Sequence, residues 1–225
     1  MSPERMIERL SATQRFAHFV ITTSIIILLL TGLPITFGEQ MRWFMNVFGG
    51  PNISMLLHRI AAFVLILMSI YYGTYYVLSV INGKSSVRAI FFGLDDTKDA
   101  YQDIEFSFNR SDKEPRSGKY NWIMKVSLIW TVFEIFVLTV TGLILWFPWY
   151  FLEIWPRNYM VAVATIHGMF GIMALLHFTS HYAATHFYPG KFPINYVIFT
   201  GKITEEEAKE EFPAWYDEIN KEATR

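Results

Sequence analysis

The sequence predicts an all-α integral membrane protein, a four-helix bundle with four transmembrane helices. Hydrophobic residues make up 52% of its 225 residues and charged residues only 17%. The apolar residues gather into four blocks, each near the roughly 20 residues that a helix needs to cross a bilayer core. Strands of a membrane β-barrel would be shorter and would alternate in polarity. The chain has no Cys, which excludes disulfides and Cys-ligated clusters and leaves His as the main possible metal ligand.

The four blocks divide the chain into a membrane part and a polar tail. They run over residues 16–37, 55–81, 122–147 and 159–187. Prolines and glycines such as Pro34, Gly38 and Pro148 mark block ends. We therefore expect a transmembrane domain over 1–189, with a long polar loop at 82–120, and a tail over 190–225. In the tail, Thr204 followed by three Glu predicts the start of a short amphipathic helix over 204–220.

The distribution of Lys and Arg predicts the orientation. Most of the 19 basic residues lie in the N-terminal segment, the long loop or the tail. The two remaining loops hold only Arg42 and Arg157, and Arg59 lies just inside the second block. The positive-inside rule then places both termini and the long loop in the cytoplasm.

Six histidines lie within or at the edges of the apolar blocks: His18, His58, His167, His177, His181 and His186. An ionisable side chain at this depth is costly and needs a partner. With the predicted orientation, four of them form two pairs of matching depth. His58 and His167 make an outer pair, and His18 and His181 an inner pair. Each pair joins two different helices, as axial ligation of a haem by two histidines requires.

The spacing on the fourth block fits two stacked haems b. His167 and His181 are 14 residues apart, which leaves them about 40° apart around a helix and roughly 21 Å apart along its axis. His177 lies one turn before His181 on nearly the same face, so geometry favours His181 only weakly. Three glycines would admit a flat macrocycle or serve ordinary helix packing: Gly142, Gly168 and Gly171.

Three further charged residues have two interpretations each. Glu134 falls near the middle of the third block, where a carboxyl is expensive. It is either a proton relay or, as we favour, a protonated group satisfied inside the bundle. Arg15 and Arg59 lie close to ligand candidates and would pair with haem propionates or extend to the membrane interface.

Short motifs along nearly the whole chain also indicate a family. They are Arg15-x-x-His18, Leu57-His58, Gly118-Lys119-Tyr120-Asn121, Thr141-Gly142-x-Ile144-x-Trp146, the 14-residue histidine spacing, and Pro213-Ala214-Trp215-Tyr216-Asp217-Glu218-Ile219. In these the chain resembles the cytochrome b (gamma) subunit of membrane-bound formate dehydrogenases. More distantly it resembles the cytochrome b subunits of nickel–iron hydrogenases and thiosulfate reductases. The resemblance implies two haems b on the four paired histidines, with His181 preferred over His177. It also implies a quinone site at Asn121, bordered by His181.

Together these features predict the membrane cytochrome b subunit of a respiratory oxidoreductase complex in the inner membrane. Two haems b would carry electrons between an extracytoplasmic iron–sulfur subunit and menaquinone or ubiquinone, in either direction. A separate catalytic subunit would act on a substrate that this chain does not reveal. We expect no catalytic residue and no nucleic-acid partner here. One alternative is a di-haem carrier without its own quinone site. Another is a non-haem membrane anchor or transporter, although transporters usually show broken helices or repeats at mid-membrane.

Overall fold

The computed structural model describes residues 5–83, 85–87, 90–112, 116–187 and 190–223. Four of the basic residues counted for the orientation lie outside these described residues, namely Lys84, Arg88, Lys113 and Arg225, and so does Pro189 at the end of the expected transmembrane domain. The orientation drawn from the basic residues stays a prediction, and so does the domain boundary at 189/190.

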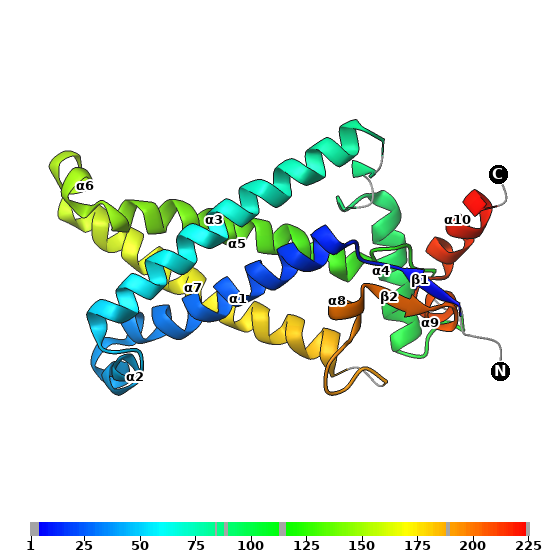
Figure 1. The fold of residues 1–225 in the computed structure, drawn as a ribbon, viewed down its shortest axis with the longest axis horizontal. Coiled ribbons are helices and arrows are strands. Elements are labelled where there is room, and N and C mark those ends of the chain that lie inside the picture. Colours follow the sequence, from blue (N-terminus) through cyan, green and yellow to red (C-terminus); the bar gives the residue numbers. More distant parts are fainter. Residues whose placement is uncertain (1–4, 84, 88–89, 113–115, 188–189, 224–225) are drawn as a thin grey trace. The chain divides into compact units, whose positions relative to one another are not determined.

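Four long helices dominate the structure (Figure 1): α1 (Ala12–Phe37), α3 (Pro51–Ile81), α5 (Trp122–Trp146) and α7 (Arg157–His186). All four are long and apolar enough to cross a membrane. Their bounds follow the four apolar blocks of the sequence, because long apolar runs can satisfy their backbone in lipid only as helices. The prediction of a mainly helical chain with four spans is therefore confirmed.

Pro34 was interpreted as a block end, and this was wrong. It lies inside α1 and is buried. A proline in a helix interior loses one backbone hydrogen bond and crowds the preceding turn. Membrane helices tolerate this where neighbouring groups satisfy the freed carbonyl, so α1 continues to Phe37.

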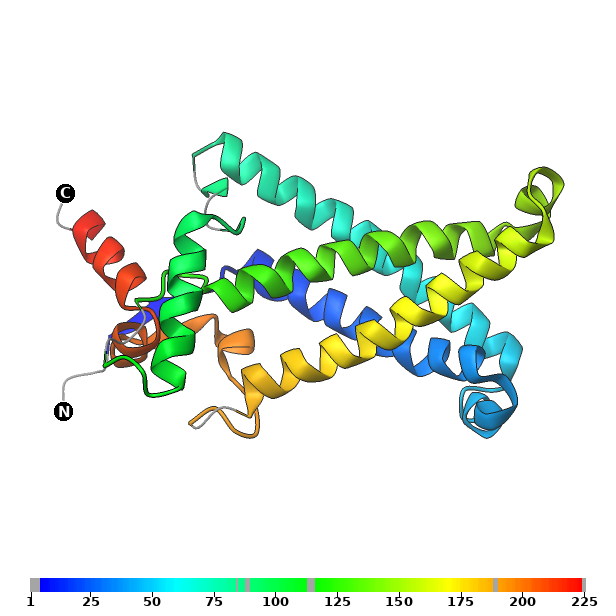
Figure 2. The same ribbon diagram turned by 180° about the vertical axis from the view of Figure 1, so that it is seen from behind.

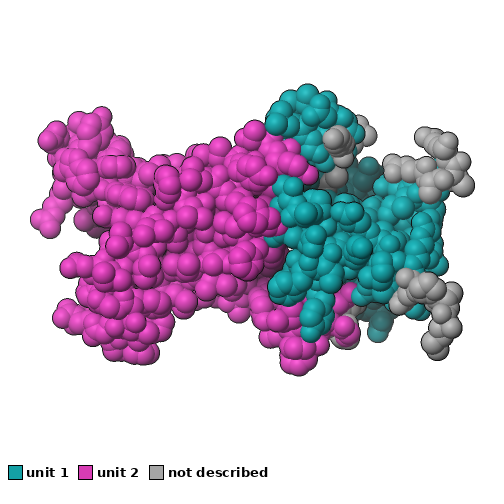
Figure 3. Space-filling model, viewed as in Figure 1, with its two compact units in different colours: residues 1–15, 76–130, 196–225 teal, residues 16–75, 131–195 magenta. Residues whose placement is uncertain are grey.

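The chain divides into two compact units (Figure 3). Unit 2 comprises residues 16–75 and 131–195, and unit 1 comprises residues 1–15, 76–130 and 196–225. In unit 2, two connections contain short helices that the sequence did not predict: η1 (Gly38–Met41) and α2 (Arg42–Val47) in one, α6 (Pro148–Ile154) in the other. Figures 1 and 2 show both connections at the same end of unit 2, so α1–α3 and α5–α7 form two hairpins.

Many of the buried residues of unit 2 are small or polar, whereas many large apolar side chains are exposed. Its buried residues include Ala17, Ser24, Thr31, Ser54, Ala61, Glu134 and Thr141. By contrast, Phe63 is 55% exposed and Phe136 is 65% exposed. Small residues let membrane helices approach closely, and lipid chains accept the large side chains outside. This distribution fits a bundle surrounded by lipid.

Unit 1 is built around a two-stranded sheet, which the all-α prediction missed. Strand β1 (Met6–Glu8) pairs antiparallel with β2 (Lys202–Thr204), with Ile7 opposite Ile203. The sheet joins the segment before the first span to the segment after the fourth. A compact core surrounds it, made of Ile7, Ile203, Ala208, Phe212 and Trp215.

The remaining helices of unit 1 are α4 (Leu94–Ser107), α8 (Val197–Thr200), α9 (Glu205–Glu211) and α10 (Pro213–Ala223). The long loop therefore contains a helix, α4, that its polar composition concealed. The tail helix expected over 204–220 is in fact β2, α9 and α10, because Pro213 starts a new helix after Phe212. Its predicted start is confirmed: the Thr204 hydroxyl accepts a hydrogen bond from the Glu207 N–H at 3.1 Å.

The Thr204 cap gives a stability prediction. Thr204→Ala removes the hydroxyl acceptor at the N-terminus of α9, which costs about 1 kcal/mol of local stability. Amide hydrogen exchange of residues 205–211, followed by mass spectrometry, should become about fivefold faster, as that free energy implies. Thr204→Ser keeps the acceptor and serves as the control. Equal exchange in the Ala variant and the unmodified chain would contradict the role of the cap.

Candidate functional site

The structure brings His58 of α3 and His167 of α7 together inside unit 2. Their ring centres lie 6.3 Å apart, with the ring planes inclined by 70°. Both side chains are half-buried. A metal ion bound at about 2 Å from one nitrogen of each imidazole would separate the ring centres by roughly 6 Å. The spacing of the outer pair therefore fits bis-histidine ligation of one iron.

Each histidine of the outer pair is held by a threonine on the neighbouring helix of its own hairpin. The Nδ1 atom of His58 lies 3.0 Å from Thr31 Oγ1, and that of His167 lies 2.8 Å from Thr141 Oγ1. Both threonine hydroxyls also donate to the carbonyl four residues earlier, at 2.6 Å and 2.7 Å. A hydrogen bond to the ring nitrogen that does not bind the metal orients a metal-binding histidine.

A glycine follows each of these threonines and makes room for the imidazole. A Cβ atom on Gly32 would lie 2.9 Å from Cε1 of His58, and one on Gly142 would lie 3.2 Å from Cε1 of His167. The first distance is a clash and the second is tighter than ordinary van der Waals contact. Gly142 thus accommodates the His167 ring.

The other two glycines singled out in the sequence differ from Gly142. A Cβ on Gly168 would lie 3.2 Å from Cγ2 of Thr36 on α1, an approach as tight as that at Gly142 but to a methyl group of a neighbouring helix instead of a histidine. A Cβ on Gly171 would have no atom within 4 Å of it among those considered in the described residues.

The inner pair is more open. His18 of α1 and His181 of α7 are both exposed in the isolated chain. They lie close enough for their imidazoles to interact electrostatically. The ring of His177 lies 6.5 Å from that of His181, one helical turn away. The structure thus gathers the inner candidates at one place, with His177 still a neighbour of His181.

Glu134 is buried, with 4% of its surface exposed. Its Oε2 lies 2.7 Å from Nδ1 of His177, which joins α5 to α7. The carboxyl is thus satisfied inside the bundle, as the interpretation favoured from the sequence expects. A proton relay through this group stays a hypothesis.

His186, at the end of α7, has a structural role. Its Nδ1 accepts a hydrogen bond from the Asn195 N–H at 2.9 Å, and its side chain is buried. This contact fixes the chain after the fourth span.

Asn121, the expected quinone contact, lies in unit 1 and caps α5. Its Oδ1 accepts from the Met124 N–H at 2.8 Å. Its amide group keeps two N–H donors, for which the described residues show no hydrogen bond. Oδ1 thus serves the helix, while Nδ2 is available to a ligand carbonyl.

Two basic side chains lie next to this segment. Arg9 donates to the Lys119 carbonyl at 3.0 Å and lies over the Phe212 ring, 3.5 Å from its centre. Burial lowers the pKa of the Arg9 guanidinium to about 10. Burial, and then the positive charge of Arg9, also lower the pKa of the Lys119 ammonium. The positive charge near Asn121 is therefore largely shielded from water.

The two proposed propionate partners have other contacts. Arg15 donates to the Phe199 carbonyl, and its Nε is buried without a hydrogen bond in the described part of the chain. The guanidinium of Arg59 lies 5.4 Å from the Trp146 ring, at a cation–π distance.

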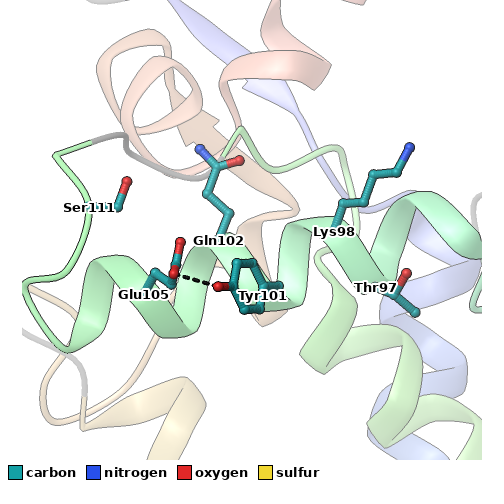
Figure 4. Close-up of a pocket in the computed structure, with 6 residues that line it drawn as sticks. All are labelled: Thr97, Lys98, Tyr101, Gln102, Glu105 and Ser111. Atoms are coloured by element: carbon teal, nitrogen blue, oxygen red, sulfur yellow. Dashed lines mark hydrogen bonds between the residues drawn. The ribbon is translucent and has the colours of Figure 1, made fainter.

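A shallow hollow on α4 is unrelated to the histidines (Figure 4). It is lined by Thr97, Lys98, Tyr101, Gln102, Glu105 and Ser111. Tyr101 is 64% exposed and donates to Glu105 at 2.6 Å. Because these are solvated side chains of one polar helix and its following loop, the hollow is not a candidate for redox chemistry.

Sequence reasoning missed the Thr31–Gly32 pair and the role of Thr141. A signal was present, since Thr-Gly-Leu occurs at 31–33 and again at 141–143. The two threonines precede His58 and His167 by 27 and 26 residues. A repeat of three residues is too short to indicate a binding site on its own, because its role depends on the histidine of the partner helix.

Comparison with known proteins agrees with the motifs. Residues 9–191 match the family described as prokaryotic cytochrome b561. Similar curated proteins include the cytochrome b556 subunits of the nitrate-inducible formate dehydrogenase from Escherichia coli (strain K12), Escherichia coli O157:H7 and Shigella flexneri. Each is 27% identical over 230 residues, covering 98% of this chain and 95% of the relative. The resemblance inferred from the motifs is confirmed.

The glycine clearances generate a testable prediction. Gly32→Ala forces the His58 ring away from α1, at a cost of about 1–3 kcal/mol for an overpacked site. The haem-to-protein ratio of the detergent-purified protein should fall, and Gly142→Ala should have a smaller effect. Gly171→Ala, which introduces no close contact, is the matched control. A full haem content in Gly32→Ala would contradict the proposed position of His58.

Proposed function

The chain belongs to the prokaryotic cytochrome b561 family, and we propose that it is the membrane cytochrome b subunit of a respiratory oxidoreductase complex. In this proposal it binds two haems b and transfers electrons between an extracytoplasmic iron–sulfur subunit and the quinone pool. The family implies haem b as the cofactor. The relatives are subunits of formate dehydrogenases, so formate is the first substrate to test for the catalytic partner.

The observation that carries the proposal is the outer histidine pair. Two imidazoles from different helices lie with their ring centres 6.3 Å apart, and each has its Nδ1 held by a hydroxyl. A pair that served only to join helices would bond directly, or through one polar partner between the rings. Within the described part of the chain, the second nitrogen of each ring has no side-chain hydrogen bond, which leaves it to a ligand in this proposal.

Bound haem supplies a one-electron couple, and the chain supplies its ligands and surroundings. His58 and His167 would hold one iron, and His18 and His181 the other. Arg15 and Arg59 are proposed to face propionates. The two N–H donors of Asn121 are proposed to bind a quinone carbonyl. The proposed contact of His181 with the quinone rests on the family resemblance alone. Both termini are proposed to be cytoplasmic, so quinone reduction there would draw its protons from the cytoplasm.

The haem assignment is tested by redox titration of the intact complex followed by visible absorption. The unmodified complex should show two one-electron b-type components. His58→Ala and His167→Ala should each remove the same component and leave the other. His186→Asn, which keeps an acceptor for the Asn195 N–H, should retain both components. Two unchanged redox components in His58→Ala would contradict the assignment of His58 as a haem ligand.

The quinone assignment is tested at Asn121 without disturbing the α5 cap. Asn121→Asp keeps an oxygen acceptor for the Met124 N–H but removes both amide donors. Loss of one hydrogen bond of about 0.5–1.5 kcal/mol should slow quinone-linked turnover roughly two- to tenfold. Haem content and haem potentials should stay unchanged. Normal quinone turnover in this variant would contradict the role of Asn121. Absence of quinone-linked turnover in the unmodified complex would instead favour the alternative of a di-haem carrier without its own quinone site.

A further inference from the structure

We propose that Thr31 and Thr141 are positioning residues that fix the tautomer of His58 and His167. Both rings would then present Nε2 to one iron, and both threonines would influence the reduction potential of that iron. The inference rests on the proposed function and extends it to two residues that no motif assigned to a role.

The direction of each hydrogen bond follows from the second contact of the threonine. A hydroxyl has one proton, and the short contacts with the carbonyls of the preceding turn use it. The oxygen can then only accept from the histidine. Nδ1 of His58 and of His167 must therefore carry the proton, because two acceptors would repel each other at 3.0 Å and 2.8 Å. In a neutral imidazole this leaves the lone pair on Nε2.

The two hairpins repeat this arrangement as a unit. In each hairpin, the first helix carries a threonine hydroxyl followed by a glycine. The imidazole of the second helix occupies the space that the glycine leaves free. Thr31 has no exposed surface and Thr141 is 7% exposed, so water cannot readily replace the hydroxyl. The repeated contact thus determines the orientation of both rings.

Two other histidines of the bundle have different partners at Nδ1. His177 uses its Nδ1 on the carboxyl of Glu134, whereas Nδ1 of His186 accepts from a backbone N–H and so carries no proton. A hydrogen bond from Nδ1–H makes an imidazole a more basic ligand and favours the more highly charged metal. A neutral hydroxyl has a weaker effect of this kind than a carboxylate. Because Nδ1–H of both outer rings donates to these hydroxyls, Thr31 and Thr141 should lower the reduction potential of the outer haem.

The test compares the two haem potentials in the intact complex. Thr31→Val and Thr141→Val retain the side-chain shape but remove the acceptor. In each variant the outer-haem ratio of ferrous to ferric iron, at a fixed applied potential, should rise about tenfold, which is about 59 mV for a one-electron couple. The inner-haem potential should not move. Thr31→Ser and Thr141→Ser should match the unmodified complex.

Thr165→Val is the matched control on α7. Thr165 makes the same bond to the carbonyl four residues earlier, at 3.0 Å, but is exposed. It should leave both potentials unchanged.

Thr31→Cys covers the case in which the valine variants fail to assemble, since a thiol is close to serine in shape but accepts weakly. An outer-haem potential equal in Thr31→Cys and Thr31→Ser would overturn the inference, and so would unmoved potentials in the valine variants. A shift confined to the inner haem would also overturn it. Absence of haem from the unmodified complex would instead refute the proposed function itself.

Discussion

The central constraint on this protein is that a polar group inside a lipid bilayer must find its partner within the protein. Several buried polar side chains of unit 2 have such a partner close by in the fold. Thr31 and Thr141 bond to carbonyls of the preceding turn and to an imidazole. Glu134 meets His177. Because water is absent, each of these bonds also determines which atoms of the imidazoles remain for a ligand.

The paired hairpins show why a threonine and the glycine after it act together. Without Gly32, a Cβ atom would occupy the space of the His58 ring. Without the Thr31 hydroxyl, the same ring would lose the side-chain acceptor that lies 3.0 Å from its Nδ1, and the net loss for one hydrogen bond is about 0.5–1.5 kcal/mol. The second hairpin repeats both conditions with Thr141 and Gly142. The 6.3 Å separation of the two rings thus reflects similar contacts in both hairpins, each between a threonine–glycine pair and an imidazole.

The spans could be predicted from the sequence because hydropathy is a property of consecutive residues. The pairing of His58 with His167 could also be anticipated, since charge bias and helical rise together fix depth. The Thr31–Gly32 pair could not, because its role depends on the partner helix. For the same reason β1 was missed: it is three residues long and pairs with a strand at the other end of the sequence. Helix α4 was hidden by a composition that suits an exposed helix as well as a loop.

The motifs that reveal the family serve two different physical purposes. In the tail, Trp215 is buried in the core of unit 1 and Asp217 pairs with Arg116 at 2.5 Å. These residues maintain a fold around β1 and β2 in unit 1, whereas all four candidate iron ligands belong to unit 2. Thr141 and Gly142 instead contact His167 directly. A match in the tail is therefore a sign of a shared fold, and the redox assignment depends on the hydroxyl, the glycine and the imidazole of each hairpin.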